Sequence, residues 1–200
     1  MIHSLAKRVA SVFVLYGESS EEDADIYTYV CEAVIALLFN IAICLIIASL
    51  FGRVMDGIIF ITVFAALRRY AGGHHAGTHF KCILTFSIIF IGVIVLMSVM
   101  SWFHVGNTVA LLIATIACVG IVLLAPVEHA NKVSGHEFGT RRKWISRILV
   151  SMLWLFCVID FYILNSHLSL IVSFSMFSVF GSMAYAMMYR GIYLREEVTG

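Results

Sequence analysis

Six apolar runs dominate this sequence, and few folds can accommodate them. They cover about residues 27–50, 54–67, 82–103, 107–126, 147–164 and 168–189. A helix of ~20 residues crosses the ~30 Å hydrocarbon core of a bilayer, and most of the runs approach that length. Because lipid offers no hydrogen-bond partners to the backbone, such runs must be helical. The sequence therefore predicts an all-α, polytopic membrane protein with about six transmembrane helices.

The composition agrees with this class. Hydrophobic residues make up 62% of the 200 residues and charged residues only 12%, about half of the ~25% usual in soluble domains. The run at 54–67 is the shortest, so we expect it to thin the bilayer locally or to lean against its neighbours. No linker or internal repeat divides the chain, which favours a single membrane domain over residues 1–200.

Residues 1–16, ahead of the first run, have the period of an amphipathic helix. Apolar residues share one face of this helix, whereas Ser4, Lys7, Arg8 and Ser11 fall on the other. We expect the helix to lie on the membrane surface, with a plain cytosolic tail as the alternative. A signal peptide is disfavoured, because the apolar stretch is short and no small-residue cleavage site follows it.

Basic residues fall almost entirely between alternate runs. Of the 13 lysines and arginines, 12 lie on one side of the predicted bilayer, and only Arg53 lies on the other. The positive-inside rule then places both termini and the loop between the second and third runs in the cytoplasm. This distribution also favours an even number of spans.

The loop RRYAGGHHAGTHFKC, at residues 68–82, gathers the reactive side chains of the chain. If a helix begins after the glycine pair at 72–73, then His75, His79 and Cys82 share one face. An imidazole can take the proton of a thiol, and the thiolate is the form that attacks a carbonyl carbon. The start of the helix and Lys81 would both favour that anion. Cys82 and His75 are therefore the predicted nucleophile and base.

The spacing of this pair needs a bend in the chain. Two helical turns separate the two residues by about 10 Å along a straight helix. The glycines at 72, 73 and 77 favour an irregular or broken helix there. Two other interpretations stay open: His75, His79 and Cys82 could be metal ligands, although no fourth ligand is evident. The basic residues of the loop could also simply anchor helices at lipid headgroups.

The order of Arg68, Gly73, His75 and Cys82 resembles the active-site pattern of the accessory gene regulator protein B family, AgrB. In that pattern a cysteine follows the histidine by seven residues. The segment APVEHANK at 125–132 also resembles the family's proline-centred segment with its Asn-Lys pair. The chain length, the number of predicted helices and the amphipathic N-terminus agree with the family as well.

This resemblance implies a membrane cysteine endopeptidase of bacterial peptide quorum sensing, in the cell membrane with its active site on the cytoplasmic side. Cys82 would attack a propeptide similar to AgrD at the carbonyl before its C-terminal tail, with His75 as general base and then acid. The thioester so formed would allow ring closure to a thiolactone or a lactone. The resemblance implies no cofactor, no resident metal and no nucleic-acid partner.

Other polar residues receive supporting roles. Substrate-binding or supporting functions are expected of Arg68, Arg69, Gly73, His79, Glu128 and Lys132. Glu128 could also orient His75, while helix capping is an equal alternative for the residues of segment 125–132. A homodimer through small residues of the last run, including Ser182, is a further expectation. The competing functional class is a small membrane transporter or peptide exporter with a His/Cys metal or proton site.

Overall fold

The structure, a computed structural model, describes residues 6–9, 11, 24–72, 79–102, 106–125, 136–164 and 166–199. Long helices make up most of this part of the chain: α2 (Ala24–Leu50), α3 (Val54–Ala71), α4 (His79–Trp102), α5 (Gly106–Leu124), α6 (His136–Ile159) and α7 (Leu168–Thr199). A single π-helical turn, η2 (Asp160–Leu164), continues α6. The predicted all-α fold is therefore confirmed, and each of the six apolar runs coincides with a helix.

Within the described chain, five helices are long and apolar enough to cross a bilayer: α2, α4, α5, α7, and α6 together with η2. The helix α3 is not among them, because its 18 residues include Asp56, Arg68 and Arg69. Of the predicted N-terminal helix, residues 6–9 and 11 are described and helical. The remainder of residues 1–16 lies outside the described residues. The protein is a multi-pass membrane protein.

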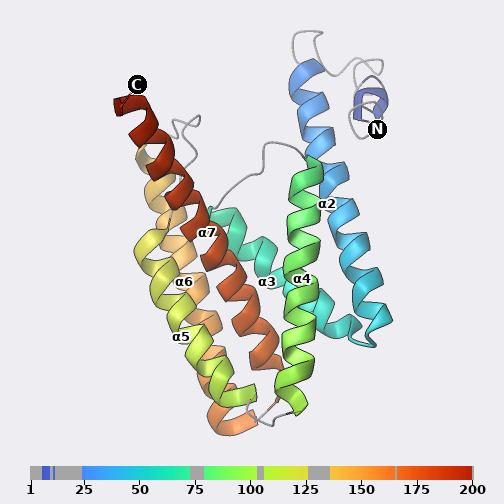
Figure 1. The fold of residues 1–200 in the computed structure, drawn as a ribbon, viewed down its shortest axis with the longest axis vertical. Coiled ribbons are helices and arrows are strands. Elements are labelled where there is room, and N and C mark those ends of the chain that lie inside the picture. Colours follow the sequence, from blue (N-terminus) through green and yellow to red (C-terminus); the bar gives the residue numbers. More distant parts are fainter. Residues whose placement is uncertain are drawn as a thin grey trace.

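The bundle is organised around α3 and α7. Figure 1 shows α3 crossing obliquely between the α2–α4 pair on one side and α5, α6 and α7 on the other. Half of the most apolar stretch of α7 is buried within the protein, against 17–22% for the other four spans. The C-terminal end of α7 and the N-terminal ends of α2 and α4 lie toward one end of the bundle (Figure 1). The α2–α3 turn lies toward the other end.

Four phenylalanines hold α3 against α4. The rings of Phe60 and Phe90 have centroids 5.1 Å apart, and so do those of Phe64 and Phe86. Such tilted and edge-on pairs add to the gain from burying the rings. The pairing of Phe60 with Phe90 and of Phe64 with Phe86 shows that the two helices run in opposite senses where they cross, with the C-terminal end of α3 on the same side as the N-terminal end of α4.

Close packing of α2 and α3 gives a first prediction. A Cβ atom added at Gly57 would lie 2.8 Å from the Cβ of Ala48. Since both atoms are attached directly to helix backbones, only separation of α2 from α3 would relieve this contact. We expect Gly57→Ala to lower the free energy of unfolding by about 1–3 kcal/mol, measured as a lower unfolding midpoint in detergent. Gly92→Ala is the control, since nothing lies within 4 Å of its added Cβ. Equal midpoints for the two variants would contradict the packing.

Candidate active site at the junction of α3, α4 and α7

Gly72 caps the end of α3 within the predicted active-site loop. Its φ of 84° lies in the left-handed region that glycine adopts without steric cost. Its N–H donates to the carbonyl oxygen of Arg68 at 3.1 Å, which closes the last turn of α3. The described part of α4 starts at His79, not directly after the glycine pair. At Gly72 the chain therefore leaves the helical path, as the spacing of the loop requires.

Arg68 on α3 interacts electrostatically with Cys82 on α4. Arg68 lies one turn beyond Phe64 on α3, and Cys82 lies one turn before Phe86 on α4. The packed pair of Phe64 and Phe86 therefore places the two polar residues on the same side of this crossing. The guanidinium lies 5.5 Å from the Phe64 ring centroid and interacts electrostatically with Cys82. Cys82 itself is partly buried.

The Arg68 guanidinium is held from a third helix as well. Its Nη1 donates a hydrogen bond to Oγ of Ser182 on α7, at 3.1 Å. Burial lowers the pKa of Arg68, and the neighbouring Cys82 opposes this because a thiolate favours the charged guanidinium. An arginine nevertheless stays protonated at neutral pH. The site therefore contains a lasting positive charge beside a thiol.

Arg69 has a different environment from Arg68. Its side chain is exposed, with the guanidinium 6.0 Å from the ring centroid of Tyr70. Its carbonyl oxygen accepts a hydrogen bond from Nη2 of Arg142 on α6, at 3.2 Å. A basic side chain that bonds the last carbonyls of a helix stabilises its C-terminus. The described contacts of Arg69 therefore connect α3 to α6.

Several predicted site residues lie outside the described residues. These are Gly73, His75, Glu128 and Lys132. His79 begins α4, but its side chain is also outside the described part of the chain. The nucleophile–base pair of Cys82 and His75, and the metal alternative that adds His79, therefore stay predictions. Of the predicted set, Arg68, Arg69 and Cys82 have described side chains, and Arg68 interacts electrostatically with Cys82.

Two residues of this site were not predicted from the sequence as site residues. Phe64 supports the guanidinium, and the spacing of four between Phe64 and Arg68 was a usable signal for a ring under an arginine. Ser182 was noted only as a small residue suited to helix packing. Since 114 positions separate it from Arg68, no local pattern could have linked the two.

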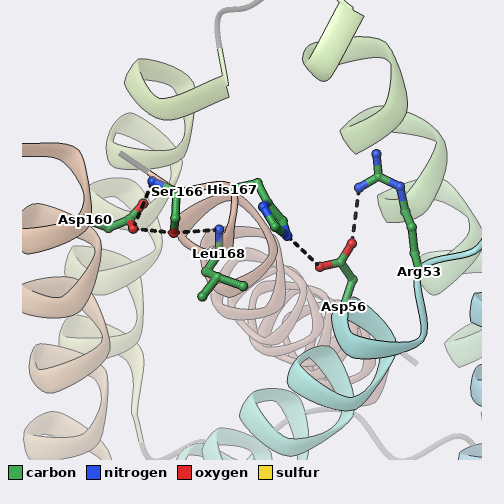
Figure 2. Close-up of polar contacts among 6 residues, drawn as sticks. All are labelled: Arg53, Asp56, Asp160, Ser166, His167 and Leu168. Carbon is green, nitrogen blue, oxygen red and sulfur yellow. Dashed lines mark hydrogen bonds and ion pairs between the residues drawn. The ribbon is translucent and has the colours of Figure 1, made fainter. Parts of the chain in front are cut away.

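A second polar cluster lies at the opposite end of the bundle (Figure 2). Nη1 of Arg53 is 3.2 Å from Oδ2 of the buried Asp56, and Nε2 of His167 is 3.7 Å from its Oδ1. On η2, the buried Asp160 accepts hydrogen bonds from the N–H and the hydroxyl of Ser166. These contacts join the α2–α3 turn to the segment that leads into α7. Asp160 lies here, at the end of the bundle opposite to Cys82.

The cluster gives a second prediction. Asp56 lies in the first turn of α3, where a carboxylate also interacts favourably with the helix dipole. We expect Asp56→Ala to lower the free energy of unfolding by about 1–3 kcal/mol, because it removes the charged acceptor of the hydrogen bond from Arg53. His167→Ala should cost less, since that side chain is 70% exposed. Thermal unfolding in detergent measures both. A larger loss for His167→Ala would contradict this assignment.

A multi-pass helical membrane protein with a thiol and a guanidinium at one end of its bundle is the class that these observations define. The family model of Accessory gene regulator B matches residues 6–187, and the chain belongs to this family. Its members act in the accessory gene regulator system of quorum sensing and are associated with peptide processing. No curated protein and no solved structure matches the chain. The resemblance that the sequence motifs indicated is therefore confirmed.

Proposed function

We propose that this protein is a membrane cysteine endopeptidase that removes the C-terminal tail of a quorum-sensing propeptide similar to AgrD. The observation that carries the proposal is a partly buried Arg68, held by Phe64 and Ser182, that interacts electrostatically with Cys82. Nucleophilic cysteines lie in electropositive, partly exposed surroundings, because the thiolate is the reactive form. Family membership supplies the biological context, which is peptide processing for quorum sensing.

In the proposed reaction, Sγ of Cys82 attacks the carbonyl carbon that precedes the propeptide tail. His75 accepts the thiol proton and returns it to the amine of the tail as the C–N bond breaks. A tetrahedral oxyanion forms on the way, and a fixed positive charge nearby stabilises it. The tail leaves, and the rest of the peptide stays bound to Cys82 as a thioester.

The thioester then permits ring closure. A cysteine thiol or serine hydroxyl within the bound peptide attacks the thioester carbonyl, and the Cys82 thiol is restored with its proton. The product is a cyclic thiolactone or lactone. Exchange of one thioester for another roughly conserves bond energy, so no ATP is needed. The partial burial of Cys82 supports this step, since limited access of water slows hydrolysis of the acyl-enzyme.

The distribution of arginines supports an acidic substrate and an active site on the cytoplasmic side. Arg68, Arg69 and Arg142 lie near one another through the contacts of α3 with α6 and α7, whereas Arg53 lies at the other end of the bundle. Basic residues cluster on the cytoplasmic side of bacterial membrane proteins. A cytoplasmic active site follows, and an acidic propeptide tail would be attracted to it.

A cleavage assay tests the proposal. Membranes that contain the protein are incubated with a synthetic, acidic-tailed propeptide, and release of the tail is followed by mass spectrometry. We expect release that persists in the presence of a metal chelator. Release that a chelator abolishes, together with a bound metal found by elemental analysis, would overturn the covalent mechanism in favour of the metal site. Passage of intact propeptide across vesicles without cleavage would overturn it in favour of the exporter.

A further inference from the structure

The position of Arg68 raises the question of what keeps its guanidinium beside Cys82. An arginine side chain on the last turn of a helix has many rotamers, and holding one of them costs conformational entropy. The Phe64 ring, on the same helix, lies against the guanidinium in a cation–π contact. Contact with another helix is needed to fix its direction around α3, and Ser182 supplies such a contact.

Ser182 differs from three serines that precede it on α7. Ser173, Ser175 and Ser178 each donate a hydrogen bond to a carbonyl oxygen of α7 itself, at 2.7–2.8 Å. The Ser182 hydroxyl accepts its bond from Arg68, which belongs to α3. A hydroxyl oxygen has two acceptor sites and suits a charged guanidinium N–H.

The register of α7 is well fixed at this point. Val179 and Met183, on either side of Ser182 in sequence, are fully buried in the hydrophobic core. The helices α3 and α7 pack against each other along this stretch. The Ser182 oxygen is therefore a rigid point in the bundle, whereas the arginine that it binds is long and flexible.

We propose that Ser182 is a positioning residue that directs the Arg68 guanidinium toward the Cys82 sulfur. This inference rests on the proposed function of Cys82 as the nucleophile. Loss of the Ser182 hydroxyl would leave the thiol and the helix in place, but it would remove the hydrogen bond that holds the guanidinium to α7. The guanidinium would then occupy its present rotamer less of the time. The positive charge at the sulfur would then fall, and with it the rate of tail cleavage.

The charge at the sulfur can be measured with two alkylating reagents. Iodoacetate and iodoacetamide both react with the thiolate at the same atom, but only iodoacetate carries a negative charge. The ratio of their rates at Cys82 cancels the fraction of thiolate and reports the local positive charge. Mass spectrometry of the peptide that contains Cys82 separates it from Cys31, Cys44, Cys118 and Cys157.

We expect loss of the charge in Arg68→Ala to lower the iodoacetate-to-iodoacetamide ratio about 3- to 10-fold at low salt. Ser182→Ala should lower the ratio by a smaller factor, about 2- to 3-fold, because the charge stays on α3 but spends less time near the sulfur. Arg68→Ala sets the full size of the effect. Ser182→Thr keeps the hydroxyl and should restore both the ratio and tail cleavage. Ser178→Ala is the matched control, because it removes a hydroxyl one turn away that bonds to Phe174 of its own helix.

The outcomes separate the inference from the proposed function. If Ser182→Ala leaves the ratio unchanged while Arg68→Ala lowers it, Ser182 does not position the guanidinium, and the inference is overturned. A fall in tail cleavage with an unchanged ratio has the same meaning, since it identifies a merely structural role. The proposed function fails by a different result, namely tail release that persists in Cys82→Ala. Only samples that are monodisperse by gel filtration enter the comparison.

Discussion

Replacing Cys82 with alanine is expected to reduce release of the propeptide tail by at least ~10³-fold, to the background of membranes without the protein. The loss is this large because no acyl-enzyme can form without the sulfur, and the remaining groups have no nucleophile to assist. The measurement is the initial rate of tail release by mass spectrometry, with equal amounts of each variant in the membrane.

Cys118→Ala is the control for this result. Like Cys82, Cys118 is a partly buried cysteine, but it lies on α5 and outside the junction of α3, α4 and α7. We expect this variant to release the tail at the rate of the unaltered protein. Substantial release of the tail by Cys82→Ala would show that Cys82 is not the nucleophile. A loss in Cys118→Ala as large as in Cys82→Ala would mean that the assay reports folding and not chemistry.

Replacing Arg68 with alanine is the second large expected effect, a fall of about 10²-fold in kcat/KM for tail release. The guanidinium lies beside Cys82, so its charge can stabilise both the attacking sulfur and the oxyanion that follows. Arg68→Lys should recover part of the rate. A lysine keeps the charge, but it lacks the planar fork that bonds Ser182 while lying on the Phe64 ring.

A change of substrate distinguishes this role from binding of the tail. If Arg68 acts at the sulfur, the loss in Arg68→Ala persists with a propeptide whose acidic tail residues are replaced by amides. If Arg68 instead binds a tail carboxylate, the loss disappears with that substrate, and the role proposed here is wrong. Arg69→Ala is the matched control, because the described contacts of Arg69 lead to Tyr70 and to α6. We expect it to lower the rate far less than Arg68→Ala.

The sequence predicted the helices well because a membrane-crossing helix is identified by the apolar composition of its own residues. Each apolar run became a helix, and even the weak run at 54–67 did so. The charged residues of this helix, α3, explain why it is not among the five helices that are apolar enough to cross a bilayer. The oblique course of α3 could not be predicted, since it depends on how Phe60 and Phe64 pack against α4.

The start of α6 was less predictable. The apolar run indicated residue 147, yet the helix begins at His136. Its first turns are polar and carry the arginines that bond the ends of two neighbouring helices. Arg142 bonds the Arg69 carbonyl of α3, and Arg147 bonds the Val122 carbonyl of α5, at 3.3 Å. Such a segment has no apolar period of its own, because partners elsewhere in the fold stabilise it.

The candidate site was predicted in part. Local spacing identified the loop and its cysteine, and it placed Arg68 in the same loop. Yet spacing left Arg68 equally suited to a lipid phosphate, because its electrostatic interaction with Cys82 depends on how Phe64 packs against Phe86. Ser182 could not be assigned at all, since its role depends on how α7 lies against α3.

The central claim is that Cys82 carries the peptide as a thioester, and intact-mass measurement tests this most directly. The purified protein in detergent is mixed with the propeptide and quenched in acid within its first turnover. The account predicts a mass increase equal to the propeptide without its tail, located on the Cys82 peptide and removed by hydroxylamine. Tail release without this adduct, or an adduct of the same mass in Cys82→Ala, would contradict the account.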